Sequence, residues 1–363
     1  MKKILFISLA VILISTLFLS SCGESAPQEV IELSSSCYLP PTHAFSPLQE
    51  EWGKEIMARS NGRVDITFYP AGQLVKAPAT PDALEQGIAD IAFSHIGYNR
   101  GRFPVTEVLD LPMGYPTGWV GSHVATDFIN KFKPAEWDSL HLLLVNAGTT
   151  AGLMTRNTRV TKLEDLQGIT LRGAGEVASA ISALGATPRD ISMAEMYDSV
   201  SKGVVDGTLV GIETLKSFKM ADVCKYTTFA WQVGNMYTFY LAMNNDKWDA
   251  LPNDIKKIFN DVSEEYAEKY AETWNQIDID GINYSLSITG NEVLTLSEAE
   301  GKRFNDAVQP VIGQYVDAMV AQGYERSKVE DWLEYITSRI EYWTEKEKER
   351  GIPSPFDVQL PQG

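Results

Sequence analysis

The chain has 363 residues, of which 44% are hydrophobic and 22% are charged, the composition of an ordinary globular protein. Its formal net charge is −17, which argues against binding to nucleic acid and against adhesion to anionic lipid. An anionic small ligand is still possible, but local cations would have to hold it against an unfavourable background field.

The N-terminus has the features of an export signal. Lys2 and Lys3 precede an apolar run, Ile4–Ser20, that is slightly short for a membrane span. The run ends in LSSC, which resembles a bacterial lipobox with Cys22 as the lipidated first mature residue; a plain signal peptide or a short anchor is the alternative. We therefore predict a lipoprotein signal peptide over 1–21 and a polar tether over 22–30. The rest would be exported to the periplasm or the cell surface, anchored by lipid at Cys22.

The first part of the mature chain alternates strand and helix patterns. Alternating or buried apolar runs predict strands, and apolar residues at helical spacing predict helices. In chain order we expect a strand over Ile31–Leu39, a helix over Ser46–Arg59, a strand over Val64–Tyr69, a short helix over Asp82–Gln86 and a strand over Ile88–Phe93.

The middle of the chain continues with a helix over Trp119–Phe132 and a buried strand over Leu140–Val145. The small residues of Gly148–Gly152 suit a crossover between two lobes. A short strand at Ile169–Arg172, a helix over Glu176–Leu184 and a second helix over Ala194–Lys202 follow. Arg172 stands where strand gives way to loop, the edge at which open α/β sheets bind ligands.

The same unit occurs on both sides of residue 150. The segment LEQGIADI at 84–91 matches VSKGVVDG at 200–207 in residue type at nearly every position, and GRVDI at 62–66 echoes GITL at 168–171. Two such units predict two α/β lobes that turn strand ends and loops toward each other. Helix–glycine–strand is common in α/β proteins, which is the alternative explanation.

The C-terminal third is mainly helical. A strand at Tyr237–Met243 would return the chain to the first lobe, and Asn253–Asp280 reads as a long amphipathic helix. A short strand at Glu292–Leu296, two more helices and an extended tail from Gly351 complete the prediction; the helices span Glu298–Gly323 and Val329–Arg350. We assign 31–148 with 237–280 to lobe I and 149–236 with 281–305 to lobe II, while 306–363 would pack across both. Cys37 and Cys224 fall in different lobes, so we expect buried free thiols rather than a disulfide.

Signatures of enzyme chemistry are poor. The four histidines lie far apart without metal-ligand spacing, and no nucleophile elbow, phosphate loop or zinc motif is present in the sequence. The segment GAGEVA at 173–178 fits a dinucleotide fingerprint, with Asp190 near the acidic position. It starts in mid-chain in an exported protein, which disfavours that reading. A carboxylate suits the same geometry better, since Arg172 offers a planar two-pronged donor; the alternative is a surface ion pair.

Several motifs occur in an order typical of one family. They are LEDLQGITLR at 163–172, LGATP at 184–188, EMY at 195–197, GVVDG at 203–207, YPAGQL at 69–74 and NDKWDALP at 245–252. In these, the chain resembles the extracytoplasmic solute receptors of tripartite ATP-independent periplasmic (TRAP) transporters, the DctP family, over about residues 33 to 340. The resemblance implies an α/β two-lobe periplasmic-binding-protein clamshell, type II-like, with long C-terminal helices.

The resemblance also implies a function and a site. The receptor would capture an organic acid through a salt bridge to Arg172 and deliver it to the membrane permease subunits, without catalysis, cofactor or metal. Cleft positions map to Tyr38, Phe93, His95, Gly175, Met193 and Val210, of which Phe93 and Met193 could equally be core and His95 a surface residue. Trp231 and Tyr237 are candidates because they lie near the return crossover. Glu213 could cap a helix or receive an amine or hydroxyl of the ligand.

The chain departs from the sialic-acid-binding members of that family at two places. No arginine stands in Gly148–Gly152, and Asp206-Gly207 is followed by Thr208-Leu209-Val210 without the asparagine of those relatives. Buried polar groups of a ligand need partners. We therefore expect a monocarboxylate with an apolar or aromatic remainder. An exported sensor domain, or an enzyme using Glu213 or His95 as acid–base, are the alternatives.

Overall fold

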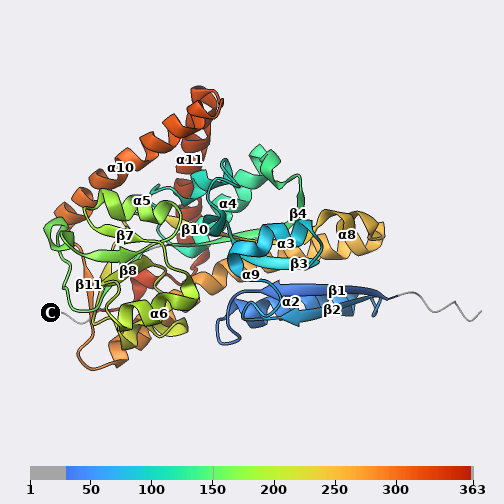
Figure 1. Cartoon of the computed structure of the whole chain (residues 1–363), viewed down its shortest axis with the longest axis horizontal. Coiled ribbons are helices and arrows are strands. Elements are labelled where there is room, and N and C mark those ends of the chain that lie inside the picture. The colour runs from blue at the N-terminus through green and yellow to red at the C-terminus, as the bar shows by residue number, and fades with distance from the viewer. Residues whose placement is uncertain (1–29, 150, 361–363) are drawn as a thin grey trace, which may run out of the picture.

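The computed structural model describes residues 30–149 and 151–360, which form two lobes, each built on its own sheet (Figure 1). The predicted signal peptide, Cys22 and all but the last residue of the tether lie outside the described residues. Lobe I carries a five-stranded sheet and lobe II a six-stranded one. The expected α/β clamshell is confirmed, and its lobes lie side by side in Figure 1, lobe I in blue and cyan, lobe II mainly in green.

The sheet of lobe I has the order β2-β1-β3-β10-β4. Strands β2, β1 and β3 are parallel, whereas β10 runs antiparallel to both of its neighbours. Its strands are β1 (Ile31–Cys37), β2 (Val64–Tyr69), β3 (Ile91–His95), β4 (Leu140–Thr149) and β10 (Met236–Asn244).

The sheet of lobe II has the order β11-β9-β5-β8-β6-β7. Strands β7, β6 and β8 are parallel, and β5 runs antiparallel to β8 and β9. Its strands are β5 (Gly152–Thr155), β6 (Thr170–Arg172), β7 (Thr187–Arg189), β8 (Gly207–Val210), β9 (Tyr226–Phe229) and β11 (Glu292–Thr295).

The two sheets share one topology. The order β2-β1-β3-β10 in lobe I corresponds to β7-β6-β8-β5 in lobe II, with an antiparallel strand in the same place. The match between 84–91 and 200–207 falls on equivalent positions, the approaches to β3 and β8. The similarity between 62–66 and 168–171 does not join equivalent strands, because it matches the outer strand β2 to the inner strand β6.

The helices cover these sheets and connect them. The α-helices are α2 (Phe45–Arg59), α3 (Thr80–Glu85), α4 (Gly118–Phe132), α5 (Glu176–Ala183), α6 (Met193–Ser201), α7 (Thr214–Ser217), α8 (Asn245–Ala250), α9 (Asn253–Ser287), α10 (Glu298–Ala321) and α11 (Arg326–Arg350). The 3₁₀ turns are η1 (Ala77–Ala79), η2 (Ile96–Asn99), η3 (Thr106–Asp110), η4 (Ala135–Trp137), η5 (Leu163–Leu166), η6 (Met220–Asp222) and η7 (Pro355–Asp357).

Three predicted boundaries are wrong for physical reasons. The crossover at Gly148–Gly152 does lead from lobe I to lobe II, but the predicted strand before it is too short, because β4 continues to Thr149 and β5 already starts at Gly152. The strand expected from Ile88 starts at Ile91, since Ile88 lies 54% exposed before it. Helix α9 continues beyond Asp280 to Ser287. Gly281 does not end the helix but serves packing, because a Cβ there would come 2.5 Å from the Ile212 carbonyl oxygen.

Helix α9 is the element that both lobes share. It packs on α2, α4 and β4 of lobe I and on α7 and β11 of lobe II. Its Trp274 lies against glycines of lobe I: a Cβ at Gly148 would come 2.7 Å from the indole, and one at Gly118 would collide with Trp274 itself. These glycines, one in α4 and one in β4, therefore let α9 approach both elements closely.

The C-terminal helices form a hairpin, orange to red in Figure 1. Helix α10 packs on α5 and η5 of lobe II, and α11 packs on α4 and η3 of lobe I. Because the two arms hold different lobes, the hairpin bridges them.

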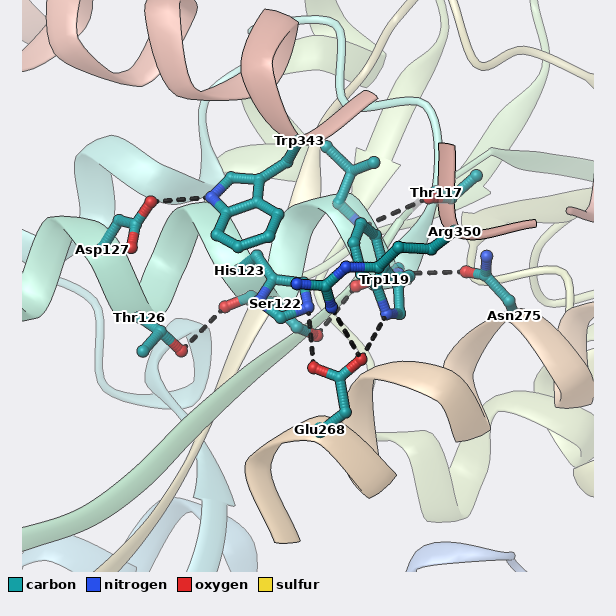
Figure 2. A network of polar contacts seen from close by, with 12 residues as sticks. Thr117, Trp119, Ser122, His123, Thr126, Asp127, Glu268, Asn275, Trp343 and Arg350 are labelled. Atoms are coloured by element: carbon teal, nitrogen blue, oxygen red, sulfur yellow. Dashed lines mark hydrogen bonds and ion pairs between the residues drawn. The ribbon is translucent and has the colours of Figure 1, made fainter. Parts of the chain in front are cut away.

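A polar network fixes α11 to lobe I and α9 (Figure 2). The Glu268 carboxylate lies 3.1 Å from His123 Nε2 and accepts a hydrogen bond from Trp119 Nε1, and Arg350 lies 3.6 Å from it. The indole of Trp343 stacks on His123 and donates to Asp127 Oδ2 at 2.7 Å. Three helices far apart in sequence, α4, α9 and α11, thus meet in one half-buried cluster.

Other features of the described residues bear on the sequence predictions. Cys37 and Cys224 are buried and free, as expected. Within 30–149 and 151–360, no helix combines the length and the apolar character needed to cross a bilayer. The same residues contain no cluster of three or more His, Cys, Asp or Glu side chains able to hold a metal ion.

The close approach of α9 to lobe I predicts opposite effects for two glycine substitutions. Gly118→Ala should lower the free energy of unfolding by about 1–3 kcal/mol, because the new methyl group overpacks against Trp274. Gly313→Ala is the control: it lies exposed in the middle of α10 with open space around it, and should raise the free energy of unfolding by about 0.5–1 kcal/mol. Urea unfolding of the three proteins measures both values, and equal effects would contradict the packing argument.

Candidate functional site

A cavity lies between the two lobes. Its walls surround about 480 Å³ of space not filled by atoms, a volume that includes space open to solvent. Lobe I contributes mainly aromatic and histidine side chains, lobe II contributes two charged residues among apolar and small ones, and α9 contributes Trp274. The walls include Tyr38, His43, His95, Tyr98, Tyr237 and Phe239 on one side and Arg172, Met193, Val210, Glu213 and Phe218 on the other.

Arg172 is the cation of this inter-lobe cavity. It is the last residue of β6, an inner strand, and its side chain is 1% exposed. Its Nε donates to the Ile191 carbonyl oxygen at 2.8 Å, which fixes the orientation of the guanidinium, whereas its buried Nη1 has no hydrogen-bond partner. No carboxylate of the described residues lies within ion-pair distance of it. A buried guanidinium in this state is unsatisfied until an acceptor arrives.

The neighbouring strand positions β6 closely. Thr208 of β8 donates its hydroxyl to the Arg172 carbonyl oxygen at 3.1 Å, and Gly207 pairs with Leu171. A side chain at Gly207 would collide with the backbone of Met154 in β5, so glycine is required there. The end of β6, and with it Arg172, is therefore held by backbone packing on both sides.

Aromatic rings form the lobe I wall. Phe239 and Trp274 line the cavity with ring centroids 5.2 Å apart, and Phe93 stacks behind Phe239 at 5.6 Å. Tyr38 stacks on Phe93 at 6.3 Å and meets the ring of Tyr98 edge-on at 5.7 Å. Such a wall is suited to an apolar or aromatic group.

His95 is buried and neutral beside this wall. Burial, with a smaller contribution from the charge of Arg172, lowers the pKa of His95 to about 3. Its Nε2 lies 3.6 Å from Asp110 Oδ2, and burial raises the pKa of Asp110 well above its usual value. Asp110 in turn accepts from the Thr238 backbone N–H at 2.9 Å. The neutral imidazole therefore adds no positive charge to the cavity.

Glu213 forms an acidic end of the same cavity. Burial raises the pKa of Glu213 to about 8, and the nearby Asp278 carboxyl adds to that rise. Burial likewise raises the pKa of Asp278 to about 7, although it accepts from the Glu213 backbone N–H at 2.8 Å. His43 Nε2 lies 3.8 Å from Glu213, and burial lowers the pKa of His43 to about 3. The Glu213 carboxyl thus has no cationic partner among the described residues.

The two lobes touch beside the cavity. Arg100, which follows η2 of lobe I, forms an ion pair of 2.7 Å with Glu176 at the start of α5 in lobe II. Next to it, Gly175 adopts φ +56° and abuts Gly97, where a Cβ on Gly175 would come 3.2 Å from the Gly97 Cα. Only a residue without a side chain fits this contact comfortably.

The structure brings most of the predicted site residues together. Arg172, Tyr38, His95, Met193, Val210, Glu213 and Tyr237 all line the inter-lobe cavity. Phe93 lies one layer behind the wall, and Gly175 lies at the lobe contact rather than in the lining. The placement of Trp231 was wrong: it is 41% exposed and packs on Phe356 at the surface, because the chain between β9 and β10 loops outward there.

Sequence reasoning missed several lining residues. These are His43, Tyr98, Phe218, Phe239 and Trp274. Trp274 and Phe239 lie on elements whose apolar pattern signals only burial. His43 and Phe218 lie outside any recognisable motif, so only the tertiary structure could place them.

Comparison with known proteins agrees with this geometry. Residues 38–318 match the family described as bacterial extracellular solute-binding protein, family 7. The C4-dicarboxylate-binding periplasmic protein DctP of Rhodobacter capsulatus is 28% identical over 212 residues. That alignment covers 54% of this chain and only 60% of the relative's length, less than two thirds.

Solved structures agree over a longer span. A TRAP periplasmic solute binding protein from Desulfovibrio salexigens, an open complex, is similar with a TM-score of 0.75 and 29% identity, covering 86% of this chain and 96% of that one. Another, from Bordetella bronchiseptica with bound (R)- and (S)-mandelate, has a TM-score of 0.76 and 26% identity, covering 86% and 99%. Since the family match spans both lobes and most of the sequence, this chain belongs to the bacterial extracellular solute-binding proteins of family 7, the DctP family.

Proposed function

We propose that the protein is the extracytoplasmic solute receptor of a TRAP transporter, which binds an organic acid between its lobes and delivers it to the membrane permease. The observation that carries the proposal is Arg172, a buried guanidinium with an unpartnered Nη1 and no carboxylate partner among the described residues. A ligand carboxylate supplies what this group lacks. The family is one of binding proteins, so no catalytic role is assigned to Glu213 or His95.

The walls restrict the class of acid. Arg172 is the single cationic side chain in the lining, and the lobe I wall is largely aromatic. The Bordetella bronchiseptica relative was solved with mandelate, an aromatic monocarboxylate. A monocarboxylate with an apolar or aromatic remainder fits these walls best. Because a ligand that binds only the folded protein raises its melting temperature, a thermal-shift screen of organic acids should identify it.

The role of Arg172 predicts a large loss of affinity on substitution. Arg172→Ala should weaken binding of the identified acid by about 2–5 kcal/mol, since the carboxylate then remains buried and unpaired. Arg189→Ala is the matched control: it occupies the paired position on β7 but is exposed, and should bind as the unchanged protein does. Isothermal titration calorimetry measures both. An Arg172→Ala protein with undiminished affinity would exclude this role for the guanidinium.

The lobe contact predicts a smaller effect on binding kinetics. We infer that the Arg100–Glu176 ion pair favours the closed arrangement of the lobes, so Arg100→Ala should weaken binding by about 1.5- to 5-fold, mainly through faster release. Arg326→Ala removes a similarly exposed ion pair, with Asp317, inside the C-terminal hairpin and should change nothing. Stopped-flow measurement of release rates distinguishes them, and identical rates for all three proteins would contradict the inference.

The N-terminal motif predicts membrane attachment. If Cys22 carries the lipid, Cys22→Ala should move the protein from the membrane fraction to the soluble exported fraction, because the lipid that attaches it is then missing. Fractionation followed by immunoblotting tests this. Cys37→Ala is the control, because that variant keeps Cys22 and the lipid on it. An unchanged membrane fraction after Cys22→Ala would show that some other feature attaches the protein.

A further inference from the structure

We propose that the Glu213 end of the inter-lobe cavity is a second binding position, whose carboxyl group forms a hydrogen bond with a hydroxyl group that the ligand carries away from its carboxylate. The inference rests on the proposed function, because it assumes that Arg172 holds the carboxylate. It narrows the ligand class from organic monocarboxylates to hydroxy-substituted ones.

The position of Glu213 is built rather than accidental. The residue lies in the turn between β8 and α7, is only 5% exposed and lines the same cavity as Arg172. Its backbone N–H donates to Asp278 of α9 at 2.8 Å, and its Oε2 accepts from the Ser217 hydroxyl. These contacts hold the carboxyl group in place from two helices.

One oxygen of this carboxyl group remains available. Oε2 is already engaged by Ser217 and is the atom nearest to His43 Nε2. His43 Nδ1 accepts from the Phe45 backbone N–H at 3.2 Å, so its proton lies on Nε2, toward Glu213. No hydrogen bond from the described residues reaches Oε1. Because Glu213 lines the cavity, a hydroxyl group on the ligand can bond to this oxygen, either as donor or as acceptor.

The number of acceptors favours a hydroxyl over an ammonium group. A hydroxyl brings one donor, whereas an ammonium brings three, and each buried donor without a partner costs free energy. Of the other polar groups in the lining, the Trp274 indole N–H is already bonded to Asn146, and His43 Nδ1 already accepts from Phe45. A hydroxyl group, which has one donor to satisfy, therefore suits the free oxygen of Glu213 better than an ammonium group with three.

Matched pairs of aromatic acids test the inference by calorimetry at one pH. The probes are benzoate and phenylacetate, each with its 3- and 4-hydroxy derivatives and its 4-aminomethyl derivative. We expect at least one hydroxy acid to bind the purified protein at least tenfold more tightly than its parent acid. Glu213→Leu should reduce that preference to less than threefold.

Two further variants keep the test decisive. Glu213→Gln preserves the shape of the side chain and takes the place of the leucine variant if that variant does not fold. It should reduce the preference for hydroxy acids at least threefold. Glu347→Gln is the control, because Glu347 is another buried acid that accepts a hydroxyl, from Thr117, but lies outside the cavity. It should keep the full preference.

The outcomes separate this inference from the proposed function. If acids bind and Arg172→Ala abolishes binding, but hydroxy acids show no preference or Glu213 variants retain it, only the second position is refuted. Tighter binding of the aminomethyl acids would refute the hydroxyl assignment in favour of an ammonium group. If no organic acid binds the protein in the broader screen, the proposed function fails and this inference fails with it.

Discussion

The guanidinium of Arg172 imposes the main constraint on this structure. A charge removed from water costs several kcal/mol unless hydrogen bonds and a counter-charge replace the lost solvation. The described residues supply one hydrogen bond, from Nε to the Ile191 carbonyl oxygen, and leave Nη1 without a partner. The described residues therefore leave this buried guanidinium incompletely paired. On the proposed function, a carboxylate that enters the cavity would supply the missing partner and so favour the arrangement of the lobes that surrounds it.

The scaffold keeps this charge in place while leaving the lobes separable. Within lobe II, Arg172 is fixed by the neighbouring strands and by the Gly207 contact with β5. Between lobes, the contacts near the cavity are slight, an exposed arginine on Glu176 and two glycines back to back. The extensive packing lies farther away, in α9 and in the C-terminal hairpin, whose network around Glu268 ties α11 to lobe I. Strong packing away from the cavity and weak contacts beside it are the arrangement that a hinged receptor needs.

The sequence predicted the parts of this arrangement that depend on local pattern. Strand and helix periodicity located the β6–α5 and α6–β8 units, and the position of Arg172 at a strand end followed from them. It could not predict which residues of separate segments meet. Trp274 and Phe239 carry a burial signal that is the same in a core and in a cavity wall, and His43 lies in a loop without a motif. Trp231 was misplaced because proximity to the return strand in sequence does not fix the direction of a loop. The sequence pattern predicts that the long helix ends at Asp280, before Gly281. Gly281 nevertheless lies inside α9, because it packs against Ile212, a tertiary contact that the sequence alone does not reveal.

On the proposed function, discrimination among acids follows from the distribution of charge in the cavity. Arg172 would attract a carboxylate, whereas Glu213 and Asp278 lie buried without a cation among the described residues. A second carboxylate on the ligand would meet these acidic groups instead of a second arginine, and it would be buried without a counter-charge, which costs free energy. Specificity of this kind comes from a charge left unpaired on the wrong ligand as much as from an attractive contact with the right one. On the proposed function, the same acidic end that accepts a hydroxyl group would exclude dicarboxylates such as those bound by the Rhodobacter capsulatus relative. The excess of negative charge over the whole chain acts in the same direction, since it disfavours each additional anionic group on the ligand.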